Sequence, residues 1–168
     1  GVQTCALPIC SVFADPAGYR LQAPAGWQVR DRTARNELIR ADLTSGSNAG
    51  VQVRLLACAP EAFDRTVEAG IESYISDMQS HWGGRVKEID RAEGTAGDAA
   101  RTVRIRADRG NGESWFLRET FVRKARRLIV LQGGCRWAGR TAFEQAFDAI
   151  VASLRFDAAA GEAEAVPD

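Results

Sequence analysis

Histidine is nearly absent from this sequence, and methionine and cysteine are scarce. The 168 residues include one histidine, one methionine and four cysteines. A single imidazole excludes a histidine-rich metal site and weakens any Ser-His or Cys-His nucleophile. His81 comes at the end of a predicted helix beside Trp82, where we expect it to interact with the last helical carbonyl groups rather than to catalyse. The sequence therefore predicts no catalytic residue, no metal site and no cofactor.

Long apolar runs and an overall charge are missing as well. No run approaches the roughly 18 apolar residues of a membrane span. Lys plus Arg and Asp plus Glu balance at 22 each, so no global field attracts nucleic acid or a membrane surface. The glycine-rich stretches lack the spacing of a phosphate-binding loop, and Asp108, Asn111 and Glu113 do not meet the calcium-loop pattern. A hairpin turn explains these three residues.

The chain divides into one domain and two atypical ends. Residues 1–10, GVQTCALPIC, resemble the translation of a sequencing-adapter oligonucleotide, so we expect Cys5 and Cys10 to be non-native and the natural N-terminus to be lost. The alternative is a genuine, slightly apolar leader. Residues 11–156 are long enough for a single domain. Residues 157–168 hold mainly alanine, glycine and acids, which predicts a disordered acidic tail.

Three consecutive strands between residues 99 and 132 form the centre of the predicted fold. In the first, polar residues alternate with apolar ones, as in a strand with one wet and one dry face; the apolar set is Val103, Ile105 and Ala107. The pair Asn111-Gly112 supplies the positive φ of a tight hairpin. Such a meander is only marginally stable until its apolar face is covered.

Two amphipathic helices are predicted to provide that cover. Apolar residues recur at spacings of three and four within residues 60–81 and again between residues 137 and 154. Thr141 and Glu144 predict a capping box in the second helix. Further strands are expected before the first helix and at residues 85–91. Two of those before the helix have predicted bounds, residues 37–43 and 51–58. The predicted class is α+β, a central antiparallel sheet of about six to seven strands with two helices packed on it.

Three degenerate motifs are spread between Phe13 and Phe156. The first is a P-x-G-W stretch (Pro24, Gly26, Trp27), whose indole we expect to lie over the core. The second is a G-x-x-A segment that opens the meander (Gly97, Ala100). The third is an F-x-x-I-x-x-S-x-x-F pattern in the last helix (Phe147, Ile150, Ser153, Phe156). Together with the strand pair that leads into one long helix, they resemble the PsbP-like family, named for an extrinsic protein of the photosynthetic oxygen-evolving complex.

The resemblance implies an αβα sandwich and binding rather than catalysis, because the family has no catalytic residues to carry over. Many bacterial members are small envelope proteins or lipoproteins. For this chain the resemblance therefore implies an extracytoplasmic location, in the periplasm or cell envelope. A lost N-terminal signal or lipid would then supply any membrane anchor. No segment ties the chain to a photosystem.

Arginines are concentrated on the polar face of the three-stranded meander, and this is the one local excess of charge that the sequence predicts there. Arg104, Arg106 and Arg118 are the candidate ligand-binding residues, for an anionic partner such as a polyanionic glycan, a phospholipid head group or an acidic protein. The alternative is a solvated sheet face on which Glu113 and Glu119 are cross-strand partners of the arginines. Aromatic residues are poorly interleaved there, so nucleic acid is not expected.

Cys58 and Cys135 each end a predicted strand just before a predicted helix. They lack the C-x-x-C spacing of a redox or zinc site, and two buried thiols are one ordinary interpretation. If the two strands run in the same direction, however, both residues fall at the same end of the sheet. We then expect the two sulfurs within bonding reach, as a disulfide that an oxidising compartment would preserve.

The preferred hypothesis is a non-enzymatic envelope protein that acts as a binding or assembly module for an unknown protein or anionic ligand. A small hydrolase-type enzyme is the second hypothesis. It would need a carboxylate pair between sheet and helix, and Asp90 and Glu93 are the nearest candidates. A cytosolic partner-binding domain is the third, which free cysteines far apart would favour. A deep pocket with convergent buried carboxylates would favour the enzyme.

Overall fold

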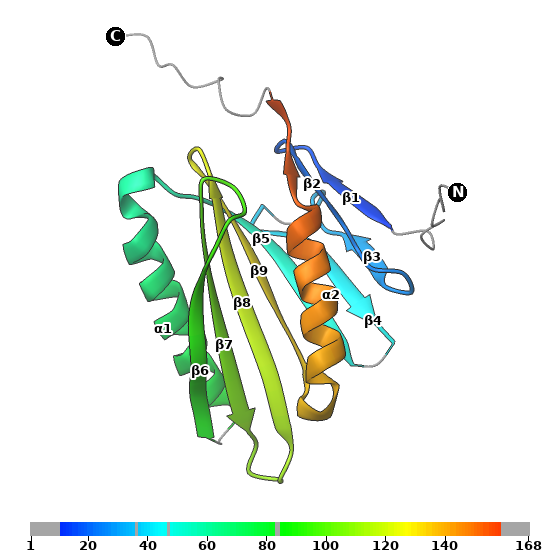
Figure 1. Ribbon diagram of the computed structural model, residues 1–168, viewed down its shortest axis with the longest axis vertical. Coiled ribbons are helices and arrows are strands. Elements are labelled where there is room, and N and C mark those ends of the chain that lie inside the picture. The colour runs from blue at the N-terminus through cyan, green and yellow to red at the C-terminus, as the bar shows by residue number, and fades with distance from the viewer. Residues whose placement is uncertain (1–10, 36, 47, 83–84, 159–168) are drawn as a thin grey trace, which may run out of the picture.

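A seven-stranded antiparallel sheet forms the centre of the protein in a computed structural model that describes residues 11–35, 37–46, 48–82 and 85–158 (Figure 1). The strand order is β3-β4-β5-β9-β8-β7-β6. The strands are β3 (Gln28–Asp31), β4 (Ile39–Ser45), β5 (Ala49–Ala57), β6 (Arg85–Gly94), β7 (Ala99–Asp108), β8 (Ser114–Lys124) and β9 (Arg127–Arg136). The predicted α+β class and the predicted size of the central sheet are confirmed.

A second, three-stranded sheet brings the two ends of the domain together. Its strands are β1 (Val12–Asp15), β2 (Tyr19–Gln22) and β10 (Arg155–Phe156), with β2 in the middle and antiparallel to both neighbours. Sequence periodicity predicted further strands before the first helix but set no strand bounds ahead of residue 37. Short strands of four residues and two residues carry too little alternation to separate β1, β2 and β10 by periodicity.

The two helices cover opposite faces of the large sheet (Figure 1). They are α1 (Phe63–Trp82), preceded by a 3-10 turn at Pro60–Ala62, and α2 (Arg140–Ser153), preceded by a 3-10 turn at Trp137–Gly139. Because consecutive strand residues point to opposite faces, Val130 of β9 packs in the core beneath α1, whereas Ile129 and Leu131 pack in the core beneath α2. Two separate cores therefore flank one sheet.

Local details confirm some of the predicted contacts. His81 Nδ1 lies 2.8 Å from the carbonyl oxygen of Asp77, as expected for a histidine in the last turn of a helix. The ring of Trp27 stacks on Phe143 with centroids 6.4 Å apart, so the indole does lie over the core. Gly112 takes the positive φ, +84°, that the hairpin between β7 and β8 requires.

The predicted capping box in the second helix is wrong. The helix begins at Arg140 after Gly139, and no side chain caps its first turn. Glu144 instead accepts a hydrogen bond from Arg104 Nε at 2.9 Å, because it faces the sheet rather than its own helix terminus. The carboxylate therefore links α2 to β7.

The predicted disulfide is also wrong, because Cys58 and Cys135 are buried free thiols. Cys58 directly follows β5 and Cys135 lies near the end of β9, and these two strands are antiparallel. In their register Ala57 is opposite Arg127, while the other end of β5 is opposite the residues next to Cys135. The two cysteines therefore lie at opposite ends of the strand pair and in different cores. The prediction had assumed strands that run in the same direction.

We expect a reducing agent to leave the thermal midpoint of the domain unchanged. A disulfide that closed so long a loop would contribute a few kcal/mol, whereas two free thiols contribute no covalent link. The measurement is a thermal melt with and without dithiothreitol, on a variant with Cys5→Ser and Cys10→Ser. A midpoint that falls by several degrees on reduction would contradict the free-thiol arrangement.

The predictions for residues 1–10 and for most of the acidic tail concern residues outside the described part of the chain. At the start of the tail, the backbone N–H of Asp157 donates a hydrogen bond to the carbonyl oxygen of Gly18 at 3.0 Å. In the described residues, neither helix combines the length and the apolar character needed to cross a bilayer.

Candidate functional site

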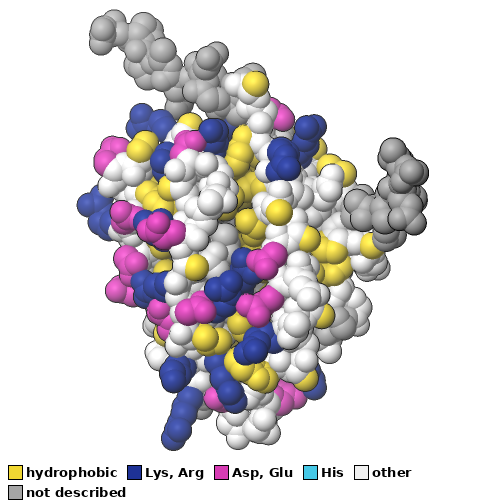
Figure 2. All heavy atoms as spheres, in the orientation of Figure 1, with side chains coloured by type: hydrophobic (Ala, Val, Ile, Leu, Met, Phe, Trp, Pro, Cys, Tyr) yellow, Lys and Arg dark blue, Asp and Glu magenta, His cyan; other side chains and the backbone are white. Residues whose placement is uncertain are grey.

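Two of the three predicted arginines line a groove between α2 and the sheet. The groove has a volume of about 600 Å³ and runs between the loop after β6 and the last turns of α2. Arg104 of β7 and Arg118 of β8 are directly opposite each other, and both line it. Arg106 does not line the groove; its guanidinium lies 4.6 Å over the ring of Trp137 and pairs with Asp108 at 2.9 Å. Figure 2 shows the basic and acidic side chains intermingled in the middle of this face.

Both groove arginines are neutralised by carboxylates of the same chain. Arg104 pairs with Asp90 and with Glu144, each at 2.9 Å. Arg118, whose side chain is only 5% exposed, pairs with Asp148 at 2.6 Å and lies over the ring of Phe147. Like charges directly opposite each other destabilise a sheet, and these acids offset that repulsion. The arrangement attaches α2 to β7 and β8, and it leaves little net positive charge for an anionic ligand.

The alternative partners suggested by the sequence are wrong. Glu113 pairs with Arg136 at 3.4 Å and with Arg109 at 3.8 Å, outside the arginine set. Glu119 points to the other face of the sheet, because it stands next to Arg118 in a strand and neighbouring side chains alternate. The helix α2 supplies two of the true partners, and its approach to the sheet could not be read from strand periodicity.

The proposed catalytic carboxylates do not converge in a buried cavity. Asp90 and Glu93 lie on the edge strand β6 with side chains 51% and 80% exposed. Each is paired with a different arginine, Asp90 with Arg104 and Glu93 with Arg101 at 3.2 Å. Within the described part of the chain, no group of three or more His, Cys, Asp or Glu side chains is arranged to hold a metal ion.

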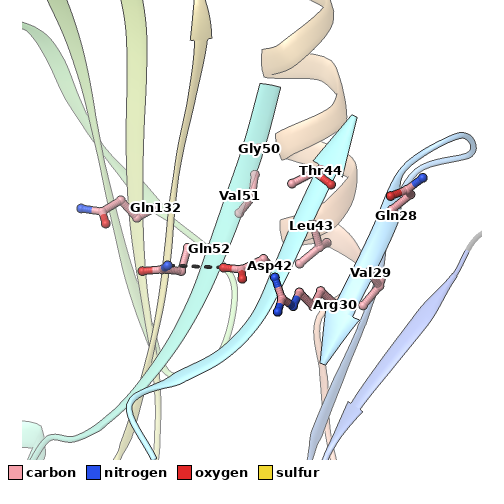
Figure 3. A pocket seen from close by; sticks show the side chains of 10 residues that line it. All are labelled: Gln28, Val29, Arg30, Asp42, Leu43, Thr44, Gly50, Val51, Gln52 and Gln132. Atoms are coloured by element: carbon pink, nitrogen blue, oxygen red, sulfur yellow. Dashed lines mark hydrogen bonds between the residues drawn. The ribbon is translucent and has the colours of Figure 1, made fainter. Parts of the chain in front are cut away.

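The opposite face of the sheet carries a hollow that no sequence pattern predicted (Figure 3). On this face α1 packs on β6, β7 and β8, and its core extends to Leu56 at the end of β5; no described helix packs on β3, β4 and the first part of β5. The hollow has a volume of about 520 Å³ and lies over β3, β4, β5 and the adjoining part of β9. In Figure 3, α2 is visible behind the sheet, on the far side from the hollow.

A row of five polar residues crosses this face, one from each of five neighbouring strands. Each residue is directly opposite the next in the strand register, in the order Arg30, Asp42, Gln52, Gln132 and Glu119. Arg30 is exposed at the outer strand, the three middle residues are half-buried, and Glu119 is 1% exposed beneath α1. The row therefore leads from solvent to a buried carboxylate. Strand alternation alone could place each residue on a face, but only the strand order aligns them.

Glu119 is a buried carboxylate with weak partners. Its Oε1 accepts a hydrogen bond from Gln132 Nε2 at 3.3 Å and lies 3.7 Å from Arg54 Nη2, while its Oε2 has no partner among the described residues. Burial raises the pKa of Glu119 to about 7, although the charge of Arg54 acts in the opposite direction. Glu119 does not line the hollow itself, but Gln132, its hydrogen-bond donor, does. A buried carboxyl with such a perturbed pKa beside a cavity-lining residue marks a candidate functional site.

Asp15 shows what a structurally satisfied buried carboxylate looks like in the same molecule. Its side chain is fully buried, yet it accepts two hydrogen bonds from Arg40, at 2.7 and 2.8 Å, and one from the backbone N–H of Ala17 at 2.7 Å. Burial alone would raise the pKa of Asp15, but these hydrogen bonds outweigh it, so the pKa is lowered. The weak pairing of Glu119 is therefore a local property and not a general feature of this fold.

Comparison with solved structures confirms the PsbP-like fold. CyanoP, the cyanobacterial PsbP from Synechocystis sp. PCC 6803, matches with a TM-score of 0.64 and 13% identity, over 93% of this chain and 97% of that chain. LpqN, described as involved in cell envelope biogenesis of Mycobacterium tuberculosis, matches with a TM-score of 0.57 and 12% identity, over 88% and 91%. A point mutant of the protein Mog1 matches with a TM-score of 0.56 and 11% identity, over 90% and 98%.

The likeness is one of structure. No family model matches the sequence, and no curated protein matches it at a significant level. At 11–13% identity the solved structures show a shared fold, and the function has to be argued from the residues of this chain.

Proposed function

We propose that this chain is a non-enzymatic binding or assembly module of the cell envelope, and that it contacts a protein partner through the uncovered half of its large sheet. The observation that carries the proposal is the polar row, which ends at a buried and weakly paired Glu119. A carboxylate in that position costs folding free energy unless something pairs with it. A partner on the open face is the simplest source of the missing interaction.

Two further observations support a module that binds a protein. Asp90 and Glu93 are exposed and separately paired, so they lack the buried, convergent geometry of a general acid and base. Arg104 and Arg118 are neutralised within the chain, so a protein partner is better supported than an anionic ligand bound by Arg104, Arg106 and Arg118. The envelope location is supported by the fold shared with LpqN, which is described as acting in cell envelope biogenesis.

A cytosolic partner-binding domain is the second candidate, and the free cysteines favour it. Cys58 and Cys135 lie in different cores and form no bridge, so they supply no argument for an oxidising compartment. Both candidates use the same binding face. They differ in whether the natural gene encodes an export signal or lipid-attachment site, which only an envelope protein would need.

Filling the hollow is expected to abolish partner binding. Thr44 is exposed and lines the hollow, so Thr44→Trp places an indole in it without disturbing the core. Peptides selected from a random displayed library against the native protein should lose at least about tenfold in affinity for this variant, because the contact surface is occluded. Affinity is measured by biolayer interferometry with synthetic peptides.

The matched control is Gln145→Trp, an exposed position on α2 at the other face of the sheet. This variant should bind the same peptides as the native protein does. If the selected peptides bind Thr44→Trp undiminished, the uncovered sheet face is not the binding surface. If they instead depend on Arg118, the α2 groove holds the ligand and the proposal fails.

A further inference from the structure

Two glutamine side chains determine the hydrogen-bonding character of the hollow. Gln132 donates through Nε2 to Glu119 Oε1 at 3.3 Å. Gln52 donates through Nε2 to Asp42 Oδ1, also at 3.3 Å (Figure 3). An ionised carboxylate only accepts hydrogen bonds, so each amide nitrogen must face its carboxylate and each amide oxygen is turned away from it. Arg32 already pairs with Asp42 at 3.0 Å, so the acceptors left at the inner part of the row are the carboxylate of Glu119 and the two amide oxygens.

Arg54 occupies the inner end of this cluster, but with poor geometry. Its Nη2 is 3.7 Å from Glu119 Oε1, which is beyond hydrogen-bonding distance. Its Nε is buried without a partner in the described part of the chain. By contrast, Arg40 makes two hydrogen bonds of 2.7 and 2.8 Å to Asp15. The side chain of Arg54 is 28% exposed, so it can move into solvent without opening either core.

We infer that the acceptor cluster formed by Glu119, Gln132 and Gln52 binds a cationic arginine or lysine side chain of the protein partner, which displaces Arg54. A guanidinium or ammonium group carries several donors and a positive charge, and it would satisfy Glu119 Oε2 as well as the amide oxygens. Arg54 then acts as an internal cation that holds the site until the partner arrives. The inference rests on the proposed function, since it assigns a specificity to the same binding face.

The first test uses a defined cationic probe and the whole protein. The peptide Ac-Gly-Arg-Gly-NH2 is titrated into ¹⁵N-labelled protein at pH 8.5, above the pKa of about 7 to which burial raises Glu119, and the side-chain amide signals of Gln52 and Gln132 are followed by NMR. We expect saturable shifts with a millimolar dissociation constant. The same peptide with citrulline in place of arginine should bind at least about tenfold more weakly, because citrulline keeps the shape but lacks the charge.

Substitutions at Glu119 and at Arg54 should change the affinity for the arginine peptide in opposite directions. Glu119→Gln should weaken the arginine peptide at least about tenfold, because the charge is lost while the shape is kept. Arg54→Met should strengthen binding of the arginine peptide several-fold, because the internal competitor is removed. The affinity of Arg54→Lys should lie between those of the native protein and Arg54→Met. A purely structural role for Arg54 would weaken binding or leave it unchanged. Equal binding of the arginine and citrulline peptides, or tighter binding of Ac-Gly-Asp-Gly-NH2 at these signals, would overturn the inference.

The second test separates this inference from the proposed function. In peptides selected against the native protein, each arginine or lysine is replaced by citrulline or norleucine, and binding to the native protein and to Thr44→Trp is measured. If binding depends on Thr44 but not on the cation, the specificity inferred for Glu119 is wrong and the binding face stands. If binding is indifferent to Thr44→Trp, the binding face itself is wrong.

Discussion

Replacement of Glu119 by glutamine is expected to stabilise the protein above pH 7. Burial raises the pKa of Glu119 from 4.5 to about 7, so the native state binds a proton more tightly than the unfolded chain does. Stability from this group is therefore present below about pH 4.5 and is lost as the pH rises through about 7. The shift corresponds to about 3 kcal/mol of unfolding free energy. The glutamine in Glu119→Gln cannot ionise, so this variant should not lose that stability as the pH rises.

The measurement is urea unfolding of native protein and Glu119→Gln at several values between pH 4.5 and pH 8.5. The free energy of unfolding of the native protein relative to the variant should fall across this interval, and the variant should be the more stable one at pH 8.5. The difference between the two proteins cancels the contributions of other titrating groups. A difference that stays constant with pH would show that Glu119 keeps an ordinary pKa and is well paired.

Replacement of Asp15 by asparagine is expected to cost about 3 kcal/mol or more of unfolding free energy. The substitution removes the charge that pairs with Arg40 across the two sheets and leaves the guanidinium near a buried neutral amide. Asparagine can still accept the hydrogen bond from the backbone N–H of Ala17, so the turn after β1 is retained. The loss should appear as a lower urea midpoint at pH 7 with an unchanged slope.

The matched control is Asp42→Asn, which breaks a pair with Arg32 whose two side chains are 25% and 30% exposed. Solvent screens such a pair, so this change should cost less than about 1 kcal/mol. The pH dependence provides a second check. The lowered pKa of Asp15 means that its stabilisation is present at neutral pH and is lost as the pH falls through the native-state value. A loss for Asp15→Asn no larger than that for Asp42→Asn would contradict the pairing.

The opposite pH dependence of Glu119 and Asp15 separates a structural carboxylate from a candidate functional one. Both are buried, but Asp15 has two short hydrogen bonds to one guanidinium, whereas Glu119 has one hydrogen bond of 3.3 Å and a distant arginine. A protein that used Glu119 only for stability would gain by replacing it with an apolar residue. A weakly paired charge that is bonded to Gln132, a residue lining the open hollow, supports the proposed binding face.

The sequence by itself determined the local elements of this protein. Alternation in the strands and apolar spacing in the helices are properties of neighbouring residues, so the central meander and both helices were predicted with ends close to those observed. The degenerate motifs were enough to indicate the PsbP-like fold. The small sheet of β1, β2 and β10 was not resolved, because strands of two to four residues carry little periodic signal.

Only the tertiary structure decided which residues meet. Periodicity places a side chain on a face but does not say which strand lies beside it or in which direction that strand runs. For that reason Cys58 and Cys135 were expected together and lie apart, and Arg104 was expected on a solvated face but pairs with Glu144 of α2. For the same reason the row that ends at Glu119 was missed: it is formed by strands distant in sequence, whose order is set by how the whole sheet packs against its two helices.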